Sequence, residues 1–140
     1  MNKIEFGDCR DTMRKWAADG VRVQTCVTSP PYFGLRDYGH DGQIGLEQTP
    51  DAYIKAMVEV FRCVWDVLAD DGTLWVNIGD SYASQGGRQV EQTVRGEKNY
   101  VNAGQLGANG VGTSRKPPIG LKQKDLIGIP WMLAFALRAD

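Results

Sequence analysis

Residues 27–32 read Val-Thr-Ser-Pro-Pro-Tyr, and the expected fold is built around them. They end an apolar run over residues 21–27 that predicts a buried strand. Each proline fixes its own φ angle and restricts the residue before it, so Ser29 and Pro30 are held extended. Their carbonyls therefore point in set directions, and the Tyr32 ring is presented at the carboxyl end of the strand. In open α/β sheets, ligands bind at this end.

The composition is that of one globular domain. The chain has 140 residues, of which 42% are hydrophobic and 24% charged, enough for a modest core. No apolar run is long enough to span a membrane, and we expect neither a signal peptide nor a membrane partner. The cysteines Cys9, Cys26 and Cys63 match neither a zinc pattern nor a disulfide framework. We therefore expect buried thiols in a reducing cytoplasm, and no bound metal.

Charge is distributed unevenly along the chain. Residues 1–87 carry 8 basic and 13 acidic side chains, a net charge of −5. Residues 88–124 carry 7 basic and 2 acidic side chains, a net charge of +5. A basic segment on an acidic body indicates an anionic partner, and the alternative is a solvated loop.

Hydrophobic periodicity predicts alternating strands and helices. Alternation at residues 4–6 predicts a short strand, and a helix over residues 11–18 follows, with Asp11 as N-cap and Gly20 as C-cap. With the strand at 21–27 these form a βαβ unit. The remaining predictions are an aromatic, glycine-rich loop at 33–48; a helix from Thr49 to Leu68; a turn at 70–72; a strand at 73–78; an irregular segment at 81–124; and a helix capped near Asp125. The helix from Thr49 has an apolar stripe, and we expect this stripe in the core together with Trp65 and Trp131. The stripe consists of Tyr53, Met57, Val60, Phe61, Val64 and Leu68.

Polar groups follow three predicted strands, at Asp8, at residues 29–32 and at Asp80. The Ser29 hydroxyl and the Pro30 carbonyl can both accept hydrogen bonds. Beside the flat Tyr32 ring, they suit a planar heterocycle that carries an exocyclic amine. Stacking of a base on an aromatic ring is worth about 1–3 kcal/mol. That is comparable with the few kcal/mol needed to extrude a base from a duplex.

The stretch at residues 27–32 resembles the catalytic motif of DNA amino-methyltransferases. These enzymes transfer a methyl group from S-adenosylmethionine to N4 of cytosine or N6 of adenine. Further similarities keep the family order over nearly the whole chain, at Gly7-Asp8 and at residues 34–38, 45–47, 74–82 and 124–131. The resemblance is to the group in which the catalytic half precedes the target-recognition region and the glycine-rich cofactor motif.

The resemblance implies an α/β fold that is part of a Rossmann-like, S-adenosylmethionine-dependent methyltransferase. Residues 1–140 would be a partial catalytic domain, with a mostly parallel sheet and a long, irregular, basic loop at 81–124 that is disordered without DNA or contacts its phosphates. Double-stranded DNA would be the partner, and a homodimer is left open. The residues implicated are Ser29, Pro30, Pro31 and Tyr32 in catalysis, Asp8 and Thr28 in cofactor binding, and Arg36, Arg115, Lys116 and Lys122 in DNA binding.

Several alternatives stay open at this stage. Serine at position 29 is typical of N4-cytosine enzymes and therefore favours cytosine, with adenine N6 as the alternative. Asp8 has a second interpretation as a cap of the first helix. No Gly-x-Gly follows a predicted strand, so the chain resembles the N-terminal part of an enzyme. A non-catalytic nucleic-acid-binding remnant, or a domain acting on a base in RNA, are the other hypotheses.

Overall fold

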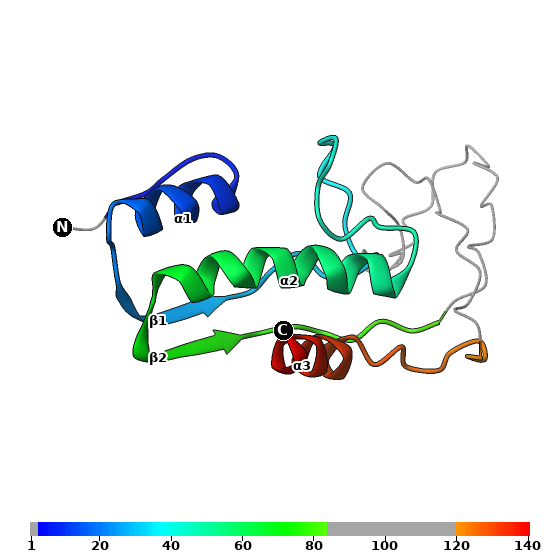
Figure 1. Cartoon of the computed structure of the whole chain (residues 1–140). Helices are drawn as coiled ribbons and strands as arrows, with labels where there is room; N and C mark the ends of the chain where they lie inside the picture. Colours follow the sequence, from blue (N-terminus) through cyan, green and yellow to red (C-terminus); the bar gives the residue numbers. More distant parts are fainter. Residues whose placement is uncertain (1–2, 84–119) are drawn as a thin grey trace.

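The computed structural model describes residues 3–83 and 120–140 (Figure 1). In chain order its elements are α1 (Cys9–Ala18), β1 (Val23–Thr28), α2 (Pro50–Val67), β2 (Leu68–Val76) and α3 (Ile129–Ala139). The fold is a small α/β arrangement, as predicted. None of the helices in the described ranges is both long and apolar enough to cross a membrane.

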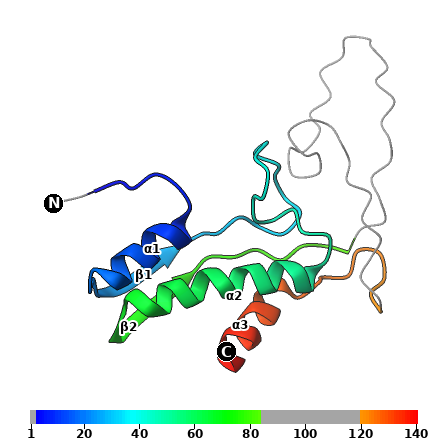
Figure 2. The same ribbon diagram turned by 45° about the horizontal axis from the view of Figure 1, so that its top comes forward.

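The two strands are parallel neighbours joined through α2, which forms a βαβ unit (Figure 2). Val27 pairs with Trp75 and Thr28 with Val76. The register is irregular between Val23 and Thr25, opposite the segment in which a turn was predicted at 70–72. The acidic Asp-Asp-Gly sequence is therefore accommodated as a bulge inside β2 instead of separating α2 from a later strand.

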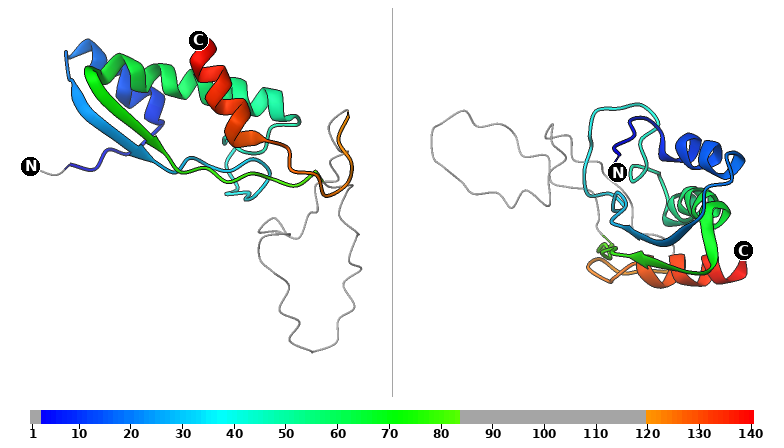
Figure 3. Two further views of the ribbon diagram at one scale, coloured as in Figure 1. Left: turned by 90° about the horizontal axis from the view of Figure 1, so that it is seen from below. Right: turned by 90° about the vertical axis from the view of Figure 1, so that its left-hand side faces the viewer.

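The three helices lie on one face of this sheet (Figure 3). Their facing side chains form the core, which contains Phe33, Tyr53, Ile54, Met57, Phe61, Val64, Ile129 and Leu133. The opposite face carries the side chains of Val27 and Trp75, which are 77% and 64% exposed. Because side chains alternate along a strand, the neighbouring Cys26, Leu74 and Val76 pack against the core instead.

Helix α2 confirms the predicted helix start at Thr49. Thr49 is the N-cap, its hydroxyl accepts a hydrogen bond from the backbone N–H of Ala52, and Pro50 opens the helix. Tyr53, Met57, Phe61 and Val64 of the apolar stripe are buried, and its other members are half-buried. Trp65 was wrongly predicted as core and is 78% exposed. It follows Val64 directly, so a turn of about 100° carries its side chain away from the core.

The N-terminal predictions were wrong in two respects. Residues 4–6 form no strand, and the side chains of Ile4 and Phe6 are 78% and 92% exposed. The first helix begins earlier than predicted, because the Asp8 carboxylate, and not that of Asp11, accepts the capping hydrogen bond from the Arg10 backbone N–H. The first predicted βαβ unit is therefore wrong, and the βαβ unit of the structure is formed by the next three predicted elements, β1, α2 and β2.

Helix α3 also begins later than Asp125. Its N-cap is Gly128 at φ +90°, which has no side chain to accept a hydrogen bond. Asp80 supplies the missing acceptor from across the chain, since its carboxylate accepts the backbone N–H groups of Gly128 and Ile129. Trp131, predicted as core, is 70% exposed. The core side of α3 is instead occupied by Ile129 and Leu133.

Candidate active site

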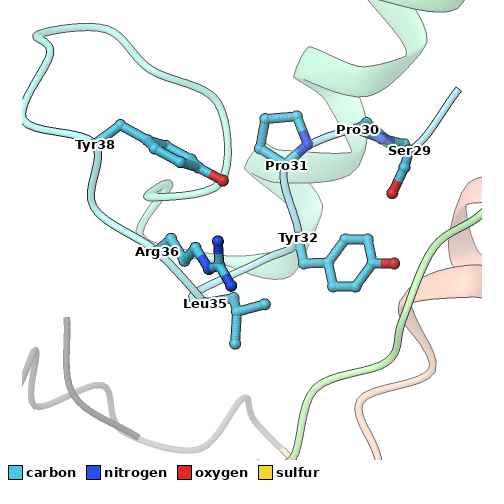
Figure 4. A pocket seen from close by; sticks show the side chains of 7 residues that line it. All are labelled: Ser29, Pro30, Pro31, Tyr32, Leu35, Arg36 and Tyr38. Atoms are coloured by element: carbon cyan, nitrogen blue, oxygen red, sulfur yellow. The ribbon is translucent and has the colours of Figure 1, made fainter. Parts of the chain in front are cut away.

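A pocket of about 300 Å³ opens at the carboxyl end of β1 (Figure 4). It is lined by Ser29, Pro30, Pro31, Tyr32, Leu35, Arg36 and Tyr38. Residues 29–32 form one wall, and Arg36 and Tyr38 reach the pocket from the loop that follows. The four residues predicted to be catalytic are therefore brought together with one of the predicted DNA contacts.

Three backbone carbonyls around this wall are already paired. The Thr28 carbonyl accepts from the Asn77 N–H, the Pro31 carbonyl from the Tyr53 hydroxyl and the Phe33 carbonyl from the Ser81 hydroxyl.

By contrast, the Ser29 hydroxyl and the Pro30 carbonyl have no hydrogen-bond partner within the described part of the chain. Both residues line the pocket, and the two prolines restrict the backbone on either side of the Pro30 carbonyl. Two residues of the pocket lining thus carry unpartnered acceptors that are available to a ligand able to donate twice.

Tyr53 anchors the wall from the core side. Its hydroxyl donates to the Pro31 carbonyl over 2.8 Å, while its ring packs against Phe33 with centroids 5.5 Å apart. The side chain is fully buried, and this burial raises the pKa of the Tyr53 hydroxyl to about 12. The hydroxyl therefore stays protonated, and remains a donor, at every physiological pH.

Two glycines fix where Tyr32 lies. A Cβ at Gly45 would come within 2.9 Å of the Tyr32 carbonyl oxygen, and Gly45 also has a φ of +106° that favours glycine. A Cβ at Gly79 would lie 3.0 Å from Cε2 and 3.2 Å from Cδ2 of the Tyr32 ring. One glycine therefore supports the backbone of Tyr32 and the other supports its ring.

Asp8 and Thr28, the predicted cofactor contacts, do not line the pocket. Both oxygens of Asp8 accept hydrogen bonds from the Arg10 guanidinium, and one of them also caps α1. These contacts lower the pKa of Asp8 to about 2, with the side-chain hydrogen bond from Arg10 as the largest cause. The structure thus supports the interpretation of Asp8 as a helix cap.

Lys122 also lies away from the pocket, in a turn where its backbone N–H donates to the Asp125 carboxylate. Arg115 and Lys116 lie outside the described residues, as does most of the segment 81–124. No cluster of three or more histidine, cysteine or acidic side chains that could hold a metal ion occurs in the described ranges.

A family model described as DNA methylase, covering N6 and N4 methyltransferases, matches residues 23–122. The chain belongs to this DNA methylase family. The matched range contains the whole pocket wall and the βαβ unit that positions it. The resemblance inferred from the motif at residues 27–32 is therefore confirmed.

Three type II methyltransferases show how far this chain resembles known relatives. The chain is 49% identical to M.SmaI of Serratia marcescens over 99% of its length, 47% identical to M.Cfr9I of Citrobacter freundii over 96% and 39% identical to M.SfiI of Streptomyces fimbriatus over 98%. It spans 43%, 41% and 27% of those proteins, respectively. No solved structure matches the chain.

Sequence reasoning missed the residues that support the wall. Tyr53 was assigned only to the core stripe of α2, although its hydroxyl contacts the pocket wall. Asp80 was expected at a strand end, with contact to a ligand or closure of a turn as alternatives, and its observed role is to cap α3. Tyr38 was seen only as part of an aromatic loop. A tyrosine in an otherwise apolar stripe was the one available signal, because buried hydroxyls need partners.

Proposed function

We propose that this DNA methylase chain is part of the catalytic domain of a type II DNA amino-methyltransferase. The observation that carries the proposal is the pair of unpartnered acceptors, Ser29 Oγ and the Pro30 carbonyl, beside the Tyr32 ring. An exocyclic amine that donates to both acceptors has its two hydrogens held in place. Its lone pair is then directed so that it can attack the methyl group of a donor. The chemistry required is positioning and electrostatic stabilisation, without a covalent intermediate.

The substrate is a base extruded from double-stranded DNA into the pocket. Tyr32 stacks on its face, and Arg36 provides a positive charge at the pocket for the adjoining phosphate. We favour N4 of cytosine as the acceptor atom because position 29 is serine, and N6 of adenine is the alternative. The amine nitrogen would form the new bond to the methyl carbon as the bond between that carbon and the donor sulfur breaks, with its electron pair left on sulfur. The methylated amine would then release one proton to water.

The methyl donor that we propose is S-adenosylmethionine, which supplies an electrophilic methyl group on a sulfonium sulfur. Of the residues predicted to contact this cofactor, few hydrogen-bonding groups are free. Asp8 has both oxygens engaged by Arg10, and the Thr28 carbonyl is bonded to Asn77, which leaves the Thr28 hydroxyl. A cofactor contact by Asp8 therefore requires Arg10 to change partner. We place the βαβ unit described here within a larger Rossmann-like sheet of the kind that binds this cofactor.

The decisive experiment is a methylation assay with product identification. The 140-residue chain is incubated with S-adenosylmethionine and unmethylated genomic DNA, and the digested nucleosides are identified by mass spectrometry. N4-methylcytosine in the reaction, absent with Tyr32→Ala, is the expected result. Tyr82→Ala is the matched control, because Tyr82 is 67% exposed and lies outside the pocket lining. N6-methyladenine would identify the alternative base.

A negative result is also informative. DNA binding without any methylated nucleoside would favour the non-catalytic, nucleic-acid-binding alternative. Equal methylation by the Tyr32→Ala variant would contradict the proposed site.

A further inference from the structure

The loop over residues 34–45 is closed at its ends and stabilised by internal hydrogen bonds. The Gly34 N–H donates to the Gly45 carbonyl over 2.7 Å, which joins the two ends of the loop. Within the loop, the Asp37 carboxylate accepts the Gly39 N–H, and the Gln43 N–H donates to the His40 carbonyl. A segment rich in glycine and polar residues thus has a defined conformation beside the pocket.

Gln43 holds the part of this loop that reaches the pocket. Its side-chain oxygen accepts the Tyr38 backbone N–H over 2.7 Å, and its side-chain nitrogen donates to the Arg36 carbonyl over 2.9 Å. The two bonds fix the orientation of the amide, because exchanging its oxygen and nitrogen would oppose donor to donor and acceptor to acceptor. One side chain therefore joins Arg36 and Tyr38, two of the three loop residues that line the pocket.

Tyr38 lines the pocket from the loop side with its ring directed toward Pro31, and the Tyr32 ring points away from it (Figure 4). Tyr32 and Tyr38 both line the cavity, and no ring contact joins them in the described part of the chain. The Tyr38 side chain is 56% exposed, although its backbone is held by Gln43. An exposed aromatic ring on a backbone held in place, at a pocket of about 300 Å³, has the character of a ligand-binding group.

We propose that Tyr38 is a second aromatic contact for the extruded nucleotide, and that Gln43 is the positioning residue that holds it there. This inference rests on the proposed function, because it takes the ligand to be a nucleobase. Tyr32 stacks on the base at the carboxyl end of β1, and Tyr38 contacts the nucleotide from the loop side of the pocket. Gln43 touches no ligand and acts only through the backbone of residues 36–38.

The test uses a probe that requires no cofactor. The 140-residue chain is titrated with a mixed-sequence, single-stranded oligonucleotide that carries one central 2-aminopurine, whose fluorescence is quenched by aromatic stacking. Tyr38→Ala is expected to lower the affinity about tenfold and to relieve part of the quenching, as expected for loss of one stacked ring. Tyr38→Phe, which keeps the ring, is expected to stay within about twofold of the unsubstituted chain.

Gln43→Met keeps the length of the side chain and removes both hydrogen bonds. It is expected to weaken binding about fivefold, and to cause no further loss when Tyr38 is already alanine, because it acts through that ring. Gln48→Met is the matched control, since Gln48 is exposed and outside the pocket lining. A Gln43→Met effect of the same size with and without the Tyr38 ring would show a general structural role and overturn the positioning proposal.

The two proposals can fail separately. If the unsubstituted chain does not bind the oligonucleotide, the proposed function and this inference both fail. If Tyr32→Ala weakens binding while Tyr38→Ala binds and quenches like the unsubstituted chain, only the second aromatic contact is overturned. Thermal unfolding of each variant, compared with that of Gln48→Met, identifies any loss of binding that comes from loss of the fold.

Discussion

Gly79 lies directly against the ring of Tyr32: a Cβ at this position would come to 3.0 Å from Cε2 of the ring. The two residues belong to different segments, one after β2 and the other after β1. Since β1 and β2 are parallel neighbours, their carboxyl ends place both residues at the same edge of the sheet. The position of the stacking ring is therefore set by the second strand as well as by its own prolines.

Gly79→Ala should displace the Tyr32 ring by a few tenths of an ångström. We expect methyl transfer to fall about tenfold, because misplacement by about 1 Å can cost about a hundredfold. The measurement is the initial rate of methyl incorporation into DNA. In a Tyr32→Ala background the same substitution should have no further effect, because the displaced group is gone. Additive losses in the double variant would mean that Gly79 acts by another route.

Sequence reasoning succeeded where the signals are local. The cap and apolar stripe of α2 are fixed by neighbouring residues, and they were predicted almost to the residue, from Thr49 to the last turn. The pocket wall at residues 29–32 was also found from sequence, because the two prolines constrain the backbone by themselves.

Sequence reasoning failed where distant residues decide the outcome. The start of α3 depends on the Asp80 carboxylate, which lies 48 residues before Gly128 and leaves no trace in the local pattern. The face on which Trp65 lies depends on where α2 meets the sheet. Tyr53 was correctly predicted to be buried, but its hydroxyl contact with Pro31 spans 22 residues and could not be read from periodicity.

Tyr53→Phe removes one hydrogen bond and keeps the ring. The Pro31 carbonyl then loses its donor, and we expect a loss of about 0.5–1.5 kcal/mol in the free energy of unfolding, measured by urea denaturation. Tyr82→Phe is the control, because that side chain is 67% exposed. A change below the error of the method would show that water replaces the Tyr53 hydroxyl at the Pro31 carbonyl.

The same hydroxyl predicts a pH dependence. The pKa of Tyr53 is about 12 in the folded chain and about 10 for an ordinary tyrosine, because burial disfavours the phenolate. Folding therefore opposes ionisation of the Tyr53 hydroxyl. The contribution of this neutral hydroxyl to the free energy of unfolding is complete below pH 10 and is lost as the pH rises toward 12. The stability difference between the unsubstituted chain and Tyr53→Phe should shrink over this range. Absorbance of phenolate near pH 10 that disappears in Tyr53→Phe would contradict the raised pKa.

Asp80→Ala removes the acceptor for the first N–H groups of α3. We expect a loss of about 1–2 kcal/mol, the usual cost of removing a helix N-cap. Asp80→Asn should cost less, because one carboxylate oxygen already accepts from Ser81, Gly128 and Ile129, and an amide keeps one oxygen. Urea denaturation measures both, with the exposed Asp71→Ala as control. Equal losses for alanine and asparagine would show that charge, and not the acceptor, stabilises the helix.

Arg36→Gln tests the proposed phosphate contact. The side chain lines the pocket, and its guanidinium has no hydrogen-bond or ion-pair partner within the described ranges, so it is available to an anion. Each phosphate contact releases about one counterion, so the slope of log affinity against log salt should become less steep by about 1. Binding to duplex DNA is measured at several salt concentrations by fluorescence anisotropy.

The control for Arg36 is Arg22→Gln. Arg22 is exposed and precedes β1, at the end of the strand opposite to the pocket, and its guanidinium donates to the Val21 carbonyl. This variant should keep the full salt slope. If both variants shift the slope equally, the effect follows net charge alone, and Arg36 has no special role. If only Arg36→Gln shifts the salt slope, the duplex backbone passes the edge of the sheet at which Ser29, Pro30 and Tyr32 form the proposed base-binding site.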